Sequence, residues 1–224
     1  MYPLVSLRRL FLVGVAALFG VFVVYAIVGN AITGIDARCW WWFITHRSNS
    51  MTTVMQAAAW LFDPPMVALF SGIMLTAVAI FRRRFALEAL TFIAIESASL
   101  TTHLLKDVIG RHRPPVVFRL TSETNFSFPS GHATAAAALM TAIVVYVWLT
   151  YRLWQTLWIG LLGLAVTVFV AVSRMYLGVH WITDVIAGSL IGCGVVCCVT
   201  AIGALLINAI QRHPHTDAAS HTAR

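Results

Sequence analysis

Long apolar runs separated by short arginine-rich or polar stretches are the feature that most limits how this chain can fold. The first run, residues 10–28, contains about 19 apolar residues, close to the ~20 that an α-helix needs to cross a bilayer. A signal peptide has a shorter apolar core of ~7–15 residues, so we expect an uncleaved first helix. Five similar runs follow at about 65–81, 85–105, 133–149, 154–172 and 181–210. The pattern predicts an all-α, polytopic membrane helix bundle with six transmembrane helices, forming a single domain over 1–224.

The composition favours a membrane protein and argues against one that binds nucleic acid. Apolar residues make up 60% of the chain, whereas a soluble domain contains about 45–50%. The formal net charge is +7, but most arginines stand at the ends of apolar runs, where membrane topology places them. We therefore expect the lipid bilayer, and no nucleic acid, as a partner. The four cysteines form no CxxC pair and no disulfide framework.

Two segments fall outside the six runs. Residues 34–62 mix charges with three consecutive tryptophans. Tryptophan favours the membrane–water interface, so we expect an amphipathic segment at the bilayer surface, with a short helix over 51–62. Residues 211–224 form a polar C-terminal tail, for which disorder is the default expectation.

The placement of arginines predicts the orientation of the bundle. With a cytoplasmic N-terminus and six spans, the C-terminus is also cytoplasmic, and the polar stretches at 106–132 and 173–180 share the outer face of the cell (plasma) membrane. The positive-inside rule favours this orientation because most arginines outside the polar stretches then lie at inner ends. These are Arg8, Arg9, Arg82, Arg83, Arg84, Arg152 and Arg212.

The stretch at 106–132 concentrates charge in an otherwise apolar chain. It contains the only lysine, Lys106, together with Arg113, and Arg174 lies on the same predicted face. Arginine offers planar paired donors that match phosphate oxygens, whereas lysine acts as a point charge. These three cations predict an anion-binding site at the membrane surface.

The residues just before the fourth run add backbone donors to these cations. Ser130 suits the N-cap of the following helix, and Gly131 lets the backbone approach a ligand closely. The free N–H groups at a helix N-terminus, together with the helix dipole, attract anions. We therefore expect a backbone cradle for the same anion.

Two histidines and a carboxylate supply groups that can react. His180 and Asp184 are four residues apart at the start of the sixth run, which puts both on one helix face. A carboxylate that holds one imidazole nitrogen orients the other and raises its basicity, as in nucleophilic triads. His132 is a second imidazole, suited to proton donation near neutral pH. Cations, backbone donors, an oriented nucleophile and a proton donor are what phosphoryl transfer through a covalent intermediate requires.

These residues stand at fixed spacings in three segments. The segments are Lys106 with Arg113-Pro114 after six residues, Pro129-Ser130-Gly131-His132, and Ser173-Arg174 followed by His180 and Asp184. This pattern resembles the three-part signature of the type 2 phosphatidic acid phosphatase family, which is shared with the vanadium haloperoxidases. Every signature position matches, and the resemblance covers about residues 60–210, with the signature itself at 106–184.

The resemblance implies a role for each residue. His180 would be the nucleophile and form a phosphohistidine, Asp184 would orient it, and His132 would protonate the leaving group and then activate water. The phosphate oxygens would be bound by Lys106, Arg113, Ser130, Gly131 and Arg174. The family needs no metal or other cofactor for phosphatase activity, and the sequence contains no carboxylate cluster of the kind that binds Mg²⁺.

The resemblance also implies a lipid phosphatase that hydrolyses a phosphomonoester or diphosphate of a membrane lipid. Undecaprenyl diphosphate is the first choice, because compact bacterial members with an outward site commonly recycle that carrier. Phosphatidylglycerophosphate or phosphatidic acid is the alternative, and a lipid phosphotransferase would use the same site. Six spans disfavour a haloperoxidase, and the intact signature disfavours a scaffold or transporter. The spacing separates none of the lipids and leaves the oligomeric state open.

Five further polar residues have no place in the signature. They are Glu96, His103, Arg111, His112 and Arg119. Glu96 and His103 share one face of the third run, and a hydrogen-bonded tie to another helix is the favoured interpretation of Glu96. The other three would bind a second phosphate or a headgroup, or carry solvated loop charge, and solvated charge is favoured.

Overall fold

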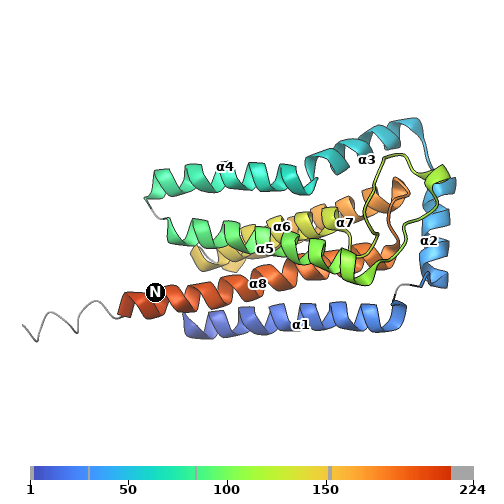
Figure 1. The fold of residues 1–224 in the computed structure, drawn as a ribbon. Helices are drawn as coiled ribbons and strands as arrows, with labels where there is room; N and C mark the ends of the chain where they lie inside the picture. Colours follow the sequence, from blue (N-terminus) through green and yellow to red (C-terminus); the bar gives the residue numbers. More distant parts are fainter. Residues whose placement is uncertain (1–2, 30, 84, 151–152, 213–224) are drawn as a thin grey trace, which may run out of the picture.

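The chain folds into a bundle of α-helices in the computed structural model, which describes residues 3–29, 31–83, 85–150 and 153–212 (Figure 1). In these ranges there is no strand, and the all-α prediction is confirmed. The helices are α1 (Leu4–Val28), α2 (Gly34–Thr45), α3 (Asn49–Leu61), α4 (Pro64–Arg82), α5 (Ala86–Ile109), α6 (Gly131–Thr150), α7 (Leu153–Tyr176) and α8 (Ile182–Arg212), with a 3₁₀ turn at Val116–Phe118. The predicted polar tail from residue 213 onward, Arg84 and Arg152 lie outside the described residues.

Six long helices run along the bundle, and five of them are long and apolar enough to cross a membrane. These are α1, α4, α6, α7 and α8. The predicted third span corresponds to α5, which has 24 residues but carries Glu88, Glu96, Lys106 and Asp107. α5 is long enough to cross a membrane, but these charged residues make it less apolar than the other five helices. The six-span layout therefore stays a prediction.

Several long helices extend further than the apolar runs indicate, and two of these extensions contain predicted site residues. α5 continues to Ile109 and α7 continues to Tyr176, so Lys106 and Arg174 lie in last helical turns and not in loops. A cation is favourable there because the C-terminal end of a helix carries partial negative charge. Gly110 ends α5 with φ of 65°, a left-handed conformation that glycine adopts without a Cβ clash.

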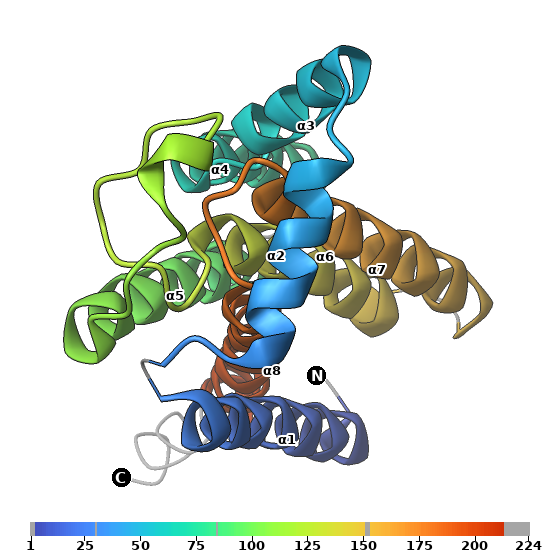
Figure 2. The same cartoon turned by 90° about the vertical axis from the view of Figure 1, so that its right-hand side faces the viewer.

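Residues 34–62 form two helices, of which α3 corresponds to the predicted short helix. α2 runs across one end of the bundle (Figure 2). Its start is specified by a capping box, in which Thr33 Oγ1 accepts from Asp36 N at 3.2 Å and Asp36 Oδ2 accepts from Thr33 N at 3.1 Å. Trp41 and Trp42 are exposed, as an interfacial belt requires, but Trp40 is buried against Phe118.

The centre of the bundle is a contact between α6 and α8 made by small residues. An alanine-rich face of α6 packs in the apolar core with α5 and α8. On α8, a Cβ added at Gly188 would lie 2.5 Å from Ser130 O, and one at Gly192 would lie 2.5 Å from Thr134 O. Small residues let helix backbones approach closely in a membrane, where packing drives association. This approach brings the start of α8 against the start of α6.

Replacing Gly192 by alanine tests this contact. We expect Gly192→Ala to lower the stability by about 1–3 kcal/mol, the usual cost of overpacking, because the added methyl group meets the Thr134 carbonyl. Gly160→Ala on α7 is the matched control, since a Cβ there meets nothing within 4 Å. Thermal unfolding in detergent measures both variants. A Gly192→Ala melting temperature equal to that of the unmodified protein would contradict the packing described.

Candidate active site

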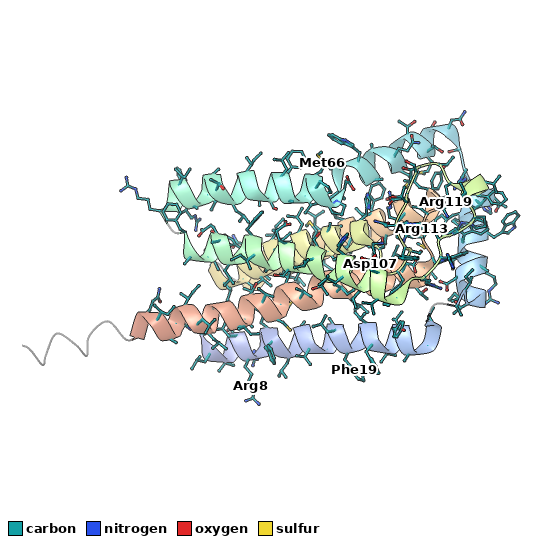
Figure 3. All side chains as sticks on the ribbon, viewed as in Figure 1. Arg8, Phe19, Met66, Asp107, Arg113 and Arg119 are labelled. Atoms are coloured by element: carbon teal, nitrogen blue, oxygen red, sulfur yellow. The ribbon has the colours of Figure 1, made fainter. Side chains whose placement is uncertain are left out.

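The polar signature segments meet around a cavity of about 320 Å³ at the end of the bundle that α2 crosses. Its wall is built by α4, α5, the loop after α5, the start of α6 and the segment before α8. The lining residues are Asp63, Pro64, Pro65, Ser99, Thr102, His103, Lys106, Arg113, Glu123, Asn125, Gly131, His132 and His180. Arg113, Arg119 and Asp107 are labelled at this end in Figure 3, far from Arg8. Of the predicted site residues, Asp184, Ser130 and Arg174 lie outside this wall but contact residues near it.

His180 is held between a carboxylate and a guanidinium. Its Nδ1 lies 3.3 Å from Asp184 Oδ2, and its Nε2 lies 3.0 Å from Arg113 Nη1. Because an arginine nitrogen can only donate, Nε2 must accept, and the ring hydrogen therefore resides on Nδ1 and points to Asp184. Nε2, the nitrogen that faces Arg113, is therefore the unprotonated one with a lone pair.

Burial keeps His180 neutral. The residue is 1% exposed. Burial, followed by the positive charges of Arg113 and Lys106, holds the pKa of His180 well below its ordinary value. An imidazole in this state is a nucleophile or a base at neutral pH, and not an acid.

The three predicted cations converge on this end of the bundle from three elements. Lys106 Nζ donates to Phe126 O at 2.6 Å, which ties α5 to the loop. Arg113 lies in the loop and Arg174 in the last turn of α7, and both guanidinium groups pair with Glu123. Burial lowers the pKa of Arg113 to about 10, so it remains protonated at neutral pH. A phosphate group would meet positive charge from more than one side.

The start of α6 provides further donors. Ser130 N donates to Asp184 O at 3.1 Å, which joins the starts of α6 and α8. The Ser130 hydroxyl is buried and has no hydrogen-bond partner within the described part of the chain. His132 lines the cavity, with Nε2 3.3 Å from Asp63 Oδ1. Burial and the nearby Glu123 carboxylate raise the pKa of Asp63.

Glu123 is a site residue that the sequence did not reveal. Its Oε2 lies 3.3 Å from Arg113 Nη2, and its Oε1 accepts a hydrogen bond from Arg174 Nη2. The carboxylate therefore occupies two guanidinium groups that are predicted to bind phosphate. No spacing in the sequence indicates this, because Glu123 belongs to an irregular loop and not to a helix face.

Arg111 contradicts both of its sequence-based interpretations. It is fully buried and pairs with Asp36 and Asp184, so it is neither solvated loop charge nor a ligand for a second phosphate. Arg119 donates from Nε to Pro114 O at 2.8 Å and shapes its own loop. The His112 carbonyl accepts from Trp181 Nε1 at 3.0 Å, while the His112 side chain is exposed.

Glu96 and His103, on one face of α5, differ in their relation to the cavity. His103 is exposed and lines the cavity, whereas Glu96 lies outside the cavity wall. The hydrogen-bonded tie at Glu96 stays a prediction. Within the residues that the structure describes, no three His, Cys, Asp or Glu side chains are grouped as metal ligands.

Comparison with known proteins gives one family. The family model described as the PAP2 superfamily matches residues 85–206, more than half of the chain. Phosphatidylglycerophosphatase B of Bacillus subtilis is 36% identical over 95 residues, which are 42% of this chain and 46% of that protein. Undecaprenyl-diphosphatase of Sulfolobus acidocaldarius is 34% identical over 118 residues, which are 50% of this chain and 53% of that protein. The chain thus spans about half the length of these curated relatives.

A solved structure shares the whole fold. The transmembrane PAP2-type phosphatidylglycerolphosphate phosphatase of Bacillus subtilis aligns with a TM-score of 0.68 at 24% identity. The alignment covers 96% of this chain and 99% of that one. The match supports the multi-pass membrane fold.

The Glu123 contacts predict that this carboxylate competes with an anionic ligand. We expect Glu123→Gln to bind orthovanadate, a phosphate analogue, about 10-fold more tightly, equivalent to about 1.4 kcal/mol. The reason is that the ligand no longer has to displace a charged group from Arg113 and Arg174. Isothermal titration calorimetry in detergent measures the affinity, with Glu96→Gln as the matched control. Unchanged or weaker binding by Glu123→Gln would show that the carboxylate does not compete.

Proposed function

The chain belongs to the PAP2 superfamily, and we propose that it is a metal-independent phosphatase of membrane lipids. It hydrolyses a phosphomonoester or diphosphate at the cavity between α4, α5 and α6. The observation that carries the proposal is the position of His180. This imidazole is neutral, its unprotonated Nε2 faces Arg113, and its Nδ1 faces Asp184. Such a ring is prepared to attack a phosphorus atom whose oxygens are held by cations.

The first step transfers the phosphoryl group to the protein. His180 Nε2 attacks the phosphorus, the bond from phosphorus to the lipid oxygen breaks, and a phosphohistidine forms. The hydrogen on Nδ1 stays between the ring and Asp184, which balances the positive charge that the ring gains. Arg113 turns from Nε2 to the phosphate oxygens as the substrate enters. Lys106, Arg174, the Ser130 hydroxyl and Gly131 N–H complete the oxygen contacts.

His132 supplies the proton of the first step, which goes to the lipid oxygen as its bond to phosphorus breaks. The second step releases phosphate: His132 takes a proton from the water that attacks the phosphohistidine. The N–P bond breaks, His180 returns to its neutral form, and inorganic phosphate leaves. His132 lines the same cavity as His180, and its Nε2 lies 3.3 Å from Asp63 Oδ1, which supports this assignment.

The lipid chain extends from the cavity along α4 and α5. Part of the cavity wall is made by Pro64 and Pro65 in the first turn of α4 and by Ser99 and His103 on α5. These two helices continue toward the other end of the bundle (Figure 1). A lipid phosphate bound at the cations would therefore keep its tail at the level of the bilayer core.

We infer six membrane spans, with α5 as the third, and a site on the outer face of the plasma membrane. Support comes from the placement of charge, since Arg8, Arg9, Arg82 and Arg83 lie at the end of the bundle opposite the site. The positive-inside rule assigns that end to the cytoplasm, together with both termini.

Undecaprenyl diphosphate remains our first choice of substrate, and phosphatidylglycerophosphate is the alternative. Relatives named for each of the two reactions match this chain at similar identity. In both cases the phosphohistidine reacts with water, and transfer to an acceptor alcohol would instead define a lipid phosphotransferase.

Replacing the two histidines tests the mechanism. We expect His180→Ala and His132→Ala each to retain less than about one thousandth of the wild-type rate, as for other residues that act as a catalytic unit. Phosphate release is measured in detergent with undecaprenyl diphosphate, phosphatidylglycerophosphate, phosphatidic acid and diacylglycerol diphosphate, with and without chelator. His112→Ala, in the same loop with an exposed side chain, is the control.

The outcomes separate the candidate functions. Turnover like wild type in either histidine variant would overturn the mechanism, and loss of activity with chelator would reveal a required metal. Phosphate appearing on an added alcohol, with little free phosphate, would favour the transferase. No wild-type activity with any of the four lipids would overturn the proposed function.

Cysteine labelling tests the orientation. We expect a membrane-impermeant maleimide to label Ser122→Cys, an exposed position in the loop between α5 and α6, in intact cells. Arg83→Cys at the opposite end is the control and should label only after lysis. The reverse pattern would invert the proposed topology.

A further inference from the structure

A buried arginine outside the signature contacts the carboxylate that faces His180. Arg111 Nη1 donates to Asp184 Oδ1 at 2.6 Å and to Thr183 Oγ1 at 2.7 Å. Its Nη2 donates to Asp36 Oδ2 and to Ala31 O, both at 2.7 Å. The side chains of Arg111, Asp36 and Asp184 are all 0% exposed. One guanidinium therefore joins the loop after α5 to α2 and to α8.

The two oxygens of Asp184 have separate partners. Oδ1 is held by Arg111, whereas Oδ2 faces His180 Nδ1 and also accepts from Trp181 N at 2.9 Å and from Ser127 Oγ. A carboxylate turns readily about its terminal bond unless both oxygens are fixed. Arg111 fixes the oxygen on the far side from the imidazole, while Trp181 N and Ser127 Oγ hold the near oxygen, so Arg111 is one of the groups that set the orientation of the carboxylate.

Asp36 completes this arrangement from α2. Its Oδ1 accepts from Thr183 N at 3.2 Å and from Thr183 Oγ1 at 2.8 Å, in the first turn of α8. Burial alone would raise the pKa of Asp36, but hydrogen bonds from Thr33, Arg111 and Thr183 outweigh it and lower the pKa. Asp36 is therefore ionised and balances the charge of Arg111 where water cannot.

We propose that Arg111 and Asp36 are positioning residues for the phosphoryl-transfer step, which act through Asp184 on His180. Through Asp36, α2 then contributes a positioning residue to the active site. This inference rests on the proposed function, since it assigns a role within that reaction. It adds no group that touches the substrate, because the side chains of Arg111 and Asp36 are fully buried and bound to each other, to Asp184 and to Thr183.

Kinetic measurements distinguish positioning residues from an ion pair that only stabilises the fold. Positioning residues affect the reacting geometry, so their loss lowers kcat and leaves KM nearly unchanged. Two residues that act through one another also give non-additive losses in a double-mutant cycle, whereas independent effects multiply.

The test is a double-mutant cycle on purified protein, with the best substrate among the four lipids. We expect Arg111→Gln to lower kcat about 100-fold, the effect of a small misplacement of a reacting group, with KM within about threefold of wild type. We expect Asp36→Asn to lower kcat about 10-fold, as for other residues that orient a functional group through a neighbour. Arg111→Gln/Asp184→Asn should be no slower than Asp184→Asn alone.

Arg119→Gln, which removes a loop arginine bound to a carbonyl, is the matched control and should match wild type.

Each outcome decides the proposal. Losses that multiply in the double variant, or an unchanged kcat in Arg111→Gln, would overturn it while leaving the phosphatase assignment intact. Absence of wild-type turnover would overturn the proposed function and this inference together. Removing one partner from a buried ion pair can prevent folding. If Arg111→Gln does not yield monodisperse protein, the cycle is run with the nearly isosteric Asp36→Asn and Asp184→Asn, and the same criterion of additivity applies.

Discussion

The contact between the first turns of α6 and α8 is the constraint on which the candidate site depends. Gly188 and Gly192 have no Cβ atom, which at these positions would clash with the Ser130 and Thr134 carbonyls. Ser130 N then reaches Asp184 O at 3.1 Å. Because His180 precedes α8 and His132 opens α6, this one contact sets the positions of both imidazoles.

Charge balance is the second condition, because these groups lie away from water. The buried cations Lys106, Arg111, Arg113 and Arg174 share one end of a largely apolar bundle with several carboxylates. Arg111 lies between Asp36 and Asp184, Arg113 and Arg174 share Glu123, and Lys106 Nζ donates to the Phe126 carbonyl. A buried charge without a partner is costly. The arrangement leaves Glu123 as the carboxylate that an incoming phosphate would replace.

Several features were predictable from the sequence for simple physical reasons. Apolar runs of membrane length become helices because a backbone in lipid must satisfy its own hydrogen bonds. Lys106, Arg113, His132 and His180 were recognised from their spacing, and they line one cavity. Helix ends were less predictable: α5 and α7 continue through Lys106 and Arg174, because cations at a helix C-terminus are compatible with helical structure.

The sequence by itself determined the all-α class, the apolar spans and the residue types available for phosphate chemistry, because local periodicity and composition depend on neighbours along the chain. Only the tertiary structure decided the partners of Arg111, Asp36 and Glu123. Asp36 is 75 residues from Arg111, and Glu123 is 51 residues from Arg174. Contacts at such separations arise when distant segments pack together. Arg111, which the sequence predicts to be solvated, is therefore buried in the fold and bound to Asp36 and Asp184.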